Sequence, residues 1–517
     1  MRARLHIIGI VAVALLAGCS DETATGSDGE RPSTTASGDD GQGAVRPSSP
    51  PDADAVTTPR VEGPVVGGKG SASLGPANFD LSTLGYQETE LFLAGTATSY
   101  GADGPLTSDG MWTVLPAATA EYRTRIVVRR PVDPADFSGT VFVEWLNVSG
   151  GLDASPDWTY THNELVRSGA AWVGVSAQAA GVVGGGNPLG AAFALKSADP
   201  DRYASLVHPG DDYSYDIFSQ AGAAVWFGDA LGGLDPEYVI AVGESQSAFR
   251  LSTYVNAVAP TLDVYDGYLI HSRSGGGAPL AEGFPAPNPN RVRTDLDVPV
   301  LVFLAETDLV GDRLGAAAAR QPDTDLYRSW EVAGTAHADA YMLGIGDTDD
   351  GSGGGDDALF AAMSDPPTGV YGGIIDCDTG VNTGPHTYVL RSAIRSLDHW
   401  VRTGEAPPEM PQLELDDAGE GYVLDEVGNA KGGVRTPQVD VPVAVLSGLG
   451  QSGAGFCGLF GTTVPLDAAA LAQRYPDHDA FVAQWNEAVD RAVDAGALLE
   501  PDAEQLRRVA AASTVGT

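Results

Sequence analysis

Apolar and polar positions follow two different patterns along this chain. The first patterned region holds three runs rich in β-branched and aromatic residues, each bounded by turn formers, at 88–98, 122–130 and 139–147. Further on, near-continuous apolar runs alternate with segments of helical spacing. The apolar runs lie at 171–178, 238–242, 265–272, 298–305 and 329–333, and the helical segments at 160–168, 214–231 and 390–403. This order predicts an α/β fold with a mostly parallel central sheet flanked by helices.

The segment 407–517 has another pattern. Gly- and Pro-rich turns alternate with short strands up to about Gly461, and helical spacing follows at 466–495, with a break near Pro476, and at 502–512. We expect this segment to be a C-terminal extension that packs on the main domain.

The N-terminus carries an export signal. Arg2 and Arg4 precede an apolar run at 5–16, which is too short to span a membrane and is typical of a signal peptide at 1–18. The run ends in Leu-Ala-Gly-Cys, which resembles the lipobox of bacterial lipoproteins, where the cysteine, here Cys19, is lipidated and becomes the mature N-terminus. An ordinary secretory signal with an incidental cysteine is the alternative. We expect an exported lipoprotein anchored to the outer face of the cell membrane.

Residues 19–64 consist mainly of Ser, Thr, Gly, Asp and Pro, with almost no large apolar side chain. Such a composition buries too little surface to fold. The sequence therefore predicts a disordered tether over 19–64, which links the lipid anchor to a folded body over 65–517.

The charge balance narrows the range of partners. The 517 residues include 69 acidic and 29 basic ones, which gives a formal net charge of -40. Because such a surface repels nucleic acid and anionic lipid headgroups, we exclude both as partners of the folded body and expect membrane contact only through the N-terminal lipid. Nothing in the sequence indicates an oligomeric state.

The acidic stretch 347–357 has two readings. Its carboxylates could bind Ca²⁺, but the stretch lacks the Gly and the terminal Glu of an EF-hand loop at their positions. We expect a solvated acidic loop.

Three cysteines are present. Once Cys19 carries the lipid, Cys377 and Cys457 remain as an even pair in an oxidising compartment, and neither has a Cys or His at metal-ligand spacing. The sequence predicts a disulfide between Cys377 and Cys457 and no metal site.

The most informative stretch is the apolar run 238–242, which leads into Gly-Glu-Ser-Gln-Ser and then into a helical pattern. A strand that ends in a sharp turn before a helix presents a serine at the C-terminal edge of a sheet, where the helix N-terminus favours developing negative charge. The turn needs small residues two positions before and after the serine, here Gly243 and Ser247. This context predicts that Ser245 is a nucleophile.

A nucleophilic serine needs a base. His337 follows the last predicted strand, in a loop at the same sheet edge, so we predict that it is the base. His271 also ends a predicted strand, but it precedes the candidate acids in the chain. The other histidines of the body fall in Pro-Gly loops, His208 and His386, or on helical stretches, His162, His399 and His478.

The acid that orients this base is expected after the run 298–305, which leads into Glu-Thr-Asp. We prefer Asp308, because the acid of such a loop usually lies a few residues beyond the strand end, and Glu306 is the alternative.

The oxyanion hole is expected to combine two backbone N–H groups. One belongs to Gln246, directly after the nucleophile, and the other to the loop after 139–147, around Asn147 and Val148.

Several stretches of the body are informative when they are taken together and in order. They are FVEWLNVSGG, AWVGVSAQ, HPGDDYSYDIFSQAG, GESQSAFRLSTYVNAV, WEVAGTAHAD, CDTGVNTGPH and GNAKGGVRTPQVDVP. With these stretches the chain resembles, from about Val65 to the C-terminus, a bacterial family of α/β-hydrolase-domain proteins. The resemblance implies an α/β-hydrolase fold, with Ser245 and His337 at the nucleophile and base positions and the C-terminal extension as part of the family's domain. It implies no substrate.

Together these expectations describe an exported, lipid-anchored serine hydrolase that cleaves carboxylic esters through Ser245, His337 and Asp308 and an acyl-enzyme. Its substrate would be a small-molecule or polymeric ester, and the mechanism requires neither a cofactor nor a metal. An acyltransferase with the same site is one alternative. A non-catalytic, lipid-anchored binding protein on a hydrolase scaffold is the other.

Overall fold

A nine-stranded sheet lies at the centre of the computed structural model, which describes residues 45–46, 48–53, 55–70, 78–185, 192–311 and 314–517. The strand order is β1-β2-β3-β5-β4-β6-β7-β8-β9, antiparallel from β1 to β5 and parallel from there to β9. The strands are β1 (Arg60–Glu62), β2 (Tyr86–Ala102), β3 (Val114–Pro131), β4 (Thr140–Trp145), β5 (Ala171–Val175), β6 (Tyr238–Glu244), β7 (Gly267–His271), β8 (Val300–Ala305) and β9 (Tyr327–Val332). The predicted signal peptide and Cys19 lie outside the described residues.

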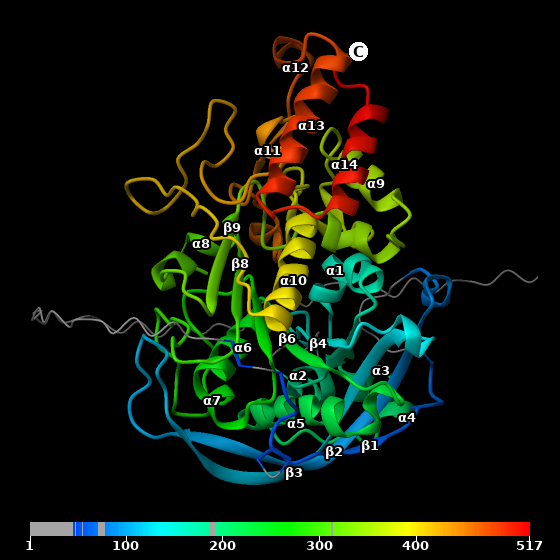
Figure 1. Ribbon diagram of the computed structural model, residues 1–517, viewed down its shortest axis with the longest axis vertical. Coiled ribbons are helices and arrows are strands. Elements are labelled where there is room, and N and C mark those ends of the chain that lie inside the picture. The colour runs from blue at the N-terminus through cyan, green and yellow to red at the C-terminus, as the bar shows by residue number, and fades with distance from the viewer. Residues whose placement is uncertain (1–44, 47, 54, 71–77, 186–191, 312–313) are drawn as a thin grey trace, which may run out of the picture.

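Helices pack on both faces of this sheet, whose central strands are buried along almost their whole length. The long helices are α1 (Pro156–Arg167) and α10 (His386–Thr403), which contact each other, and α5 (Ser214–Phe227) and α6 (Gln246–Ala257) (Figure 1). Shorter helices are α2 (Ala179–Val183), α3 (Leu195–Ala198), α4 (Pro200–Tyr203), α7 (Ala259–Leu262), α8 (Glu306–Leu309) and α9 (Gly354–Ala362). The architecture confirms the predicted mostly parallel sheet flanked by helices. Among the described residues, no helix is both long and apolar enough to cross a membrane.

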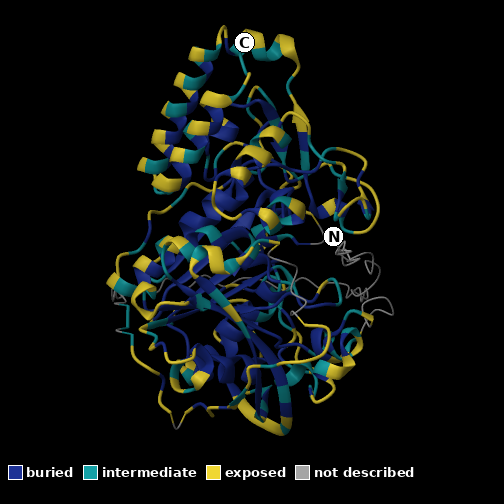
Figure 2. Cartoon of the chain, turned by 90° about the vertical axis from the view of Figure 1, so that its right-hand side faces the viewer, coloured by how far each residue is buried: buried dark blue, intermediate teal, exposed yellow. Residues whose placement is uncertain are grey.

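Aromatic side chains fill the space between the sheet and its helices. Trp172 of β5 packs on Trp158 of α1 with ring centroids 5.3 Å apart, and Trp145 of β4 packs on Phe218 of α5 at 4.7 Å. Each large ring of this kind buries a large apolar area. Figure 2 shows the buried residues concentrated around the sheet and continuing into the C-terminal helices.

Part of the predicted tether is folded. β1 pairs antiparallel with β2, Val56 is buried in the main hydrophobic core, and Arg46 forms an ion pair with Asp263 at 3.3 Å. The expectation of a disordered segment up to residue 64 is therefore wrong for the described residues from 45 onward. Composition was misleading because the edge of β2 offers unpaired backbone groups, which a short polar strand can satisfy without burying much surface.

Several elements are longer than their sequence patterns predict, β3 and α10 among them. β3 begins at Val114 rather than near 122, because its exposed first half is held by backbone pairing with β2, which leaves no apolar signal. α10 begins at His386, four residues before the predicted start, so His386 lies on a helix and not in a loop.

The C-terminal extension shares the core of the main domain. Its elements are α11 (Pro437–Asp440), β12 (Ala444–Ser447), β13 (Thr462–Pro465), α12 (Ala468–Arg474), α13 (His478–Asp494) and α14 (Glu500–Ala512). Phe481 and Trp485 of α13 are fully buried and belong to the same hydrophobic cluster as the central strands. The extension stands at one end of the molecule, beside α10 and α9 (Figure 1).

The predicted disulfide between Cys377 and Cys457 is confirmed. It joins the chain directly after β11 (Ile375–Asp376), which pairs with β10 (Gly369–Val370), to the start of the 3-10 turn Cys457–Leu459. The bond closes a loop of 80 residues and attaches the extension to the segment between β9 and α10.

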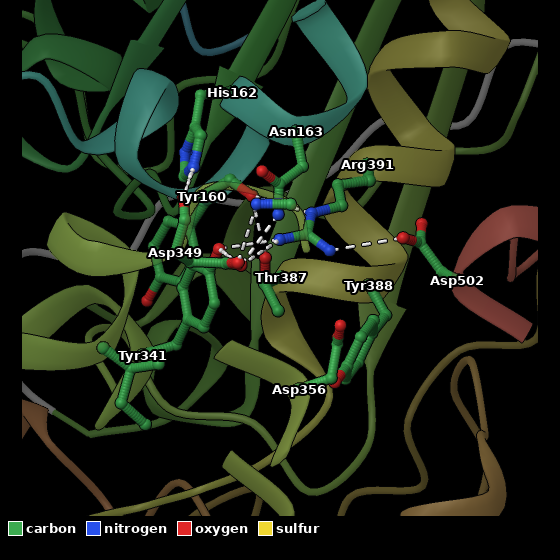
Figure 3. A network of polar contacts seen from close by, with 12 residues as sticks. Tyr160, His162, Asn163, Tyr341, Asp349, Asp356, Thr387, Tyr388, Arg391 and Asp502 are labelled. Carbon is green, nitrogen blue, oxygen red and sulfur yellow. Dashed lines mark hydrogen bonds and ion pairs between the residues drawn. The ribbon is translucent and has the colours of Figure 1, made fainter. Parts of the chain in front are cut away.

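A buried polar network makes a second attachment (Figure 3). The guanidinium of Arg391 on α10 contacts Asp349 at 3.3 Å, Asp502 of α14 at 3.2 Å and the Tyr341 hydroxyl at 2.7 Å. Asp349 belongs to the acidic stretch 347–357, so the expectation of a solvated loop is wrong for this residue. The cation that it binds is the arginine of a neighbouring helix.

Candidate active site

Ser245 occupies a sharp turn between β6 and α6. Its φ of 57° and ψ of -119° place a non-glycine residue in a sparsely populated backbone region. The Ser245 N–H donates to the carbonyl of His271, at the end of the neighbouring strand β7, at 2.9 Å. This geometry is that of a nucleophile elbow, in which the strained turn exposes the hydroxyl at the C-terminal edge of the sheet.

The turn is tight enough to require small residues on both sides. A Cβ added at Gly243 would lie 3.3 Å from the backbone C and O atoms of Ser247, which is closer than most such contacts. Ser247 itself is fully buried. A serine can stand where a second glycine is usual, because its short side chain fits this space.

His337 and Asp308 approach Ser245 from two other loops. The Nε2 atom of His337 lies 2.7 Å from Ser245 Oγ, and its Nδ1 atom lies 2.6 Å from Asp308 Oδ1. Asp308 lies in α8, directly after β8, and its other carboxylate oxygen accepts the N–H of Ala305 at 2.7 Å. The structure thus brings together the serine, histidine and aspartate that the sequence singled out.

The Glu306 carboxylate accepts hydrogen bonds from two backbone N–H groups. Its Oε1 atom accepts the N–H of Gly334 at 2.6 Å and its Oε2 atom the N–H of Gly448 at 2.8 Å, and burial raises its pKa to about 7. Of the two candidate acids, Asp308 is the one in contact with the imidazole. Glu306 instead ties the end of β8 to the histidine loop and to the extension.

One of the expected oxyanion donors is already engaged. The Asn147 N–H donates to the carbonyl of Ala154 at 2.9 Å, so the expectation for this group is wrong. Its side-chain amide donates to Glu244 Oε2 at 3.0 Å, which fixes the loop against the end of β6. Among the described residues, the N–H groups of Val148 and Gln246 have no hydrogen-bond acceptor.

A second carboxyl faces the imidazole. Glu244, directly before Ser245, places Oε1 3.4 Å from His337 Nε2, and burial raises the pKa of Glu244 to about 8. Our sequence reasoning did not identify this residue. A charged side chain at the end of an otherwise apolar strand was the available signal, because a buried carboxyl needs a partner.

Among the described residues, His337 is the histidine whose ring reaches Ser245 Oγ, and His271 meets Ser245 through its backbone carbonyl. His271 and His386 contact each other through their Nε2 atoms at 2.7 Å, behind the site. His162, His208 and His478 bond backbone carbonyls of Asp349, Ala177 and Val515, and His399 is exposed beside Glu405.

Fold and site together define an α/β hydrolase. The profile of the family described as Alpha/beta hydrolase domain matches residues 61–508, so the chain belongs to this family and the predicted resemblance is confirmed. A search of the curated proteins gives no match.

Solved structures resemble the chain only distantly. A dienelactone hydrolase from Klebsiella pneumoniae, described as putative in its title, is 11% identical, with 46% of this chain and 85% of that chain covered and a TM-score of 0.25. A serine hydrolase without a lid from Xanthomonas campestris is 12% identical, with 47% and 86% covered and a TM-score of 0.26. A thermostable esterase from Pseudomonas putida is 15% identical, with 44% and 66% covered and a TM-score of 0.23.

Proposed function

We propose that the chain is a serine hydrolase that cleaves carboxylic esters. The observation that carries the proposal is the continuous line of contacts from Asp308 Oδ1 to His337 Nδ1 at 2.6 Å and from His337 Nε2 to Ser245 Oγ at 2.7 Å. Such a line supplies an activated hydroxyl, a proton acceptor and a group that orients the acceptor.

In the acylation step, Ser245 Oγ attacks the ester carbonyl carbon while its proton moves to His337 Nε2. The new C–O bond leaves a negative charge on the former carbonyl oxygen. When this intermediate collapses, the bond to the alcohol breaks and the alcohol takes the proton from His337. Asp308 holds the Nδ1–H and stabilises the imidazolium that forms in between.

In the deacylation step, water attacks the acyl-enzyme and gives its proton to His337, which returns it to Ser245 as the acid leaves. The N–H groups of Val148 and Gln246 are the proposed oxyanion donors in both steps, because they have no acceptor among the described residues. Gln246 also begins α6, so the helix N-terminus favours charge at this point.

Hydrolysis of short-chain nitrophenyl esters tests the proposal. The wild type should release nitrophenol, and Ser245→Ala should lower kcat by at least about 10³-fold without a change in the unfolding temperature. Release that is unchanged in Ser245→Ala would contradict the proposal. Release that depends on an added alcohol, with the acyl group recovered on that alcohol, would make the protein an acyltransferase.

Export and lipid anchoring are a separate proposal that rests on the sequence alone. The signal at 1–18 and the lipobox-like Leu-Ala-Gly-Cys support lipidation of Cys19 and a location on the outer face of the cell membrane. Radiolabelled fatty acid should enter the wild type and not Cys19→Ala. Equal labelling of both would contradict this proposal and leave the proposed chemistry untouched.

A further inference from the structure

Three titratable side chains form a chain of contacts behind Ser245 and His337. Asp157 Oδ1 lies 2.8 Å from His271 Nδ1, His271 Nε2 lies 2.7 Å from His386 Nε2, and His386 Nδ1 lies 2.9 Å from the carbonyl oxygen of Ala336. All three side chains are at most 1% exposed. We call Asp157, His271 and His386 the relay. The proposed ester cleavage uses none of them.

The contacts determine where the protons lie. A carbonyl oxygen only accepts, so His386 carries a proton on Nδ1. Burial lowers the pKa of His271 to about 3 and that of His386 well below its usual range, so both rings are neutral. Neutral His386 then accepts at Nε2, which leaves His271 to donate from Nε2 and to accept at Nδ1. Asp157 therefore has to be the protonated acid that donates to His271.

The surroundings of Asp157 agree with a protonated carboxyl. The neighbouring acid Glu144 accepts three hydrogen bonds, from the N–H groups of Asp157 and Trp158 at 3.1 and 2.9 Å and from Trp172 Nε1 at 2.8 Å. Burial raises the pKa of both carboxyls. Since Glu144 faces only donors and Asp157 faces an imidazole nitrogen that needs one, the proton belongs on Asp157.

The relay contacts both halves of the proposed site through the backbone. The His271 carbonyl accepts the N–H of Ser245 at 2.9 Å, and His386 donates to Ala336, the residue before His337. The ring of Tyr160 stacks on His386 with centroids 4.2 Å apart, and its hydroxyl donates to Asp339 at 3.1 Å. The residues at 336 and 339, on either side of the base, are thus held from the same buried cluster.

We propose that Asp157, His271 and His386 are positioning residues for Ser245 and His337. They keep the Ser245 hydroxyl and the His337 ring in contact only while the relay carries three protons. Three contacts between heavy atoms need three protons, however these are distributed. Loss of one proton leaves two acceptors face to face, which costs the desolvation of an unsatisfied buried group. The inference rests on the proposed function.

Other ionisable groups face this cluster. They are Glu144 of β4, Glu244 of β6, Asp308 of α8, and His337 and Asp339 of the histidine loop. Glu244 ionises in the same pH range in which Asp157 would lose its proton. A test must therefore compare variants that share Glu244.

The test replaces Asp157 in two ways. Asp157→Asn keeps a donor to His271 that does not titrate, whereas Asp157→Leu removes it. Near pH 7, we expect Asp157→Asn to keep kcat for a nitrophenyl ester within about threefold of the wild type. Asp157→Leu should lower this kcat by about 10- to 100-fold. The ratio of Asp157→Asn to wild-type activity should rise between about pH 7 and pH 9.

Asp216→Asn is the matched control. Asp216 is a buried carboxyl on α5 that only accepts, from the N–H of Thr98 at 2.7 Å and from Gln220 Nε2 at 2.8 Å. We expect this variant to be less stable but to keep the wild-type pH dependence. Equal losses in Asp157→Asn and Asp157→Leu, or an activity ratio that stays flat with pH, would overturn the relay.

A second readout needs no activity. In the nitrogen-15 spectrum of histidine-labelled wild-type protein, assigned with His271→Gln and His386→Gln, His271 should be protonated on Nε2 and His386 on Nδ1. The opposite tautomers in the wild type would overturn the proton assignment. If the wild type cleaves no ester, the proposed function fails, while this spectrum still decides whether the relay is protonated as inferred.

Discussion

Ser245, Asp308 and His337 meet because each follows the C-terminal end of a strand in the parallel half of the sheet. The strands are β6, β8 and β9, and parallel strands direct these ends to one edge. The three positions lie 29 to 92 residues apart in the chain, as the separations of the contacting pairs show. Topology rather than local sequence therefore assembles the site.

The structure makes a sharp distinction between the two acids of α8. Asp308→Asn should lower kcat by about 10³- to 10⁴-fold, because an amide cannot hold the imidazole in the required tautomer or stabilise its charged form. Glu306→Gln should keep kcat within about tenfold, and it should lower the free energy of unfolding by about 1 to 3 kcal/mol, because one backbone N–H loses a charged acceptor. Steady-state kinetics and denaturant titration measure the two effects.

The reverse pattern would contradict this distinction. A Glu306→Gln variant that is folded and inactive, beside an active Asp308→Asn variant, would make Glu306 the acid. Folding of both variants is checked by their unfolding transitions.

At the residue scale, local patterns were sufficient to place Ser245 and His337 at the same edge of the sheet, since each follows an apolar strand. The choice of Asp308 over Glu306 needed coordinates, because both residues follow β8 and only their side-chain directions differ. The relay could not be predicted, because Asp157 and His271 are 114 residues apart in the chain and their contact depends on how α1 packs against β7.

At the scale of elements, the Arg391 network joins α10, the acidic stretch and α14. Arg391→Met should lower the free energy of unfolding by about 3 to 5 kcal/mol, because it leaves Asp349 buried without its cation and Asp502 paired with Arg167 alone. Arg508 on α14 is the matched control, since it forms an exposed ion pair with Asp357 of the same stretch at 2.8 Å. Arg508→Met should cost about 1 kcal/mol or less.

Denaturant unfolding of the two variants measures this difference. Equal and small losses would mean that the network does not hold the extension in place. Equal and large losses of unfolding free energy would mean that the exposed Arg508–Asp357 pair stabilises the fold more than surface ion pairs usually do.

Elements with buried side chains could be predicted from the sequence and elements held by the backbone could not. Apolar runs located β6, β7 and β8 to within a few residues. The folded part of the predicted tether and the first half of β3 were not predicted from the sequence. Their side chains are mostly polar or exposed, and backbone pairing with β2 holds them.

For the whole molecule, buried carboxyls set the pH dependence of stability. Burial raises the pKa of Glu244 to about 8 and those of Glu306 and Asp339 to about 7. The folded chain keeps these protons to higher pH than the unfolded chain, so stability is lost as the pH rises through these values. The net charge of -40 acts in the same direction, because self-repulsion grows as acids ionise.

We therefore expect the midpoint of thermal unfolding to fall by at least about 5 °C between about pH 5.5 and pH 8.5. The decrease should be smaller in Glu244→Gln, which has no proton to lose at that site. Added salt should recover only part of the decrease, since it screens surface charges far better than buried ones. A midpoint that rises with pH would contradict this account.

The most direct test of the central claim is to incubate the wild type with a fluorophosphonate and to map the modified peptide by mass spectrometry. The reagent phosphonylates a serine that is activated by a neighbouring base. We predict a single adduct on Ser245, formed by the wild type and absent from Ser245→Ala. No adduct on the wild type, or an adduct on another residue that persists in Ser245→Ala, would contradict the assignment of Ser245 as the nucleophile.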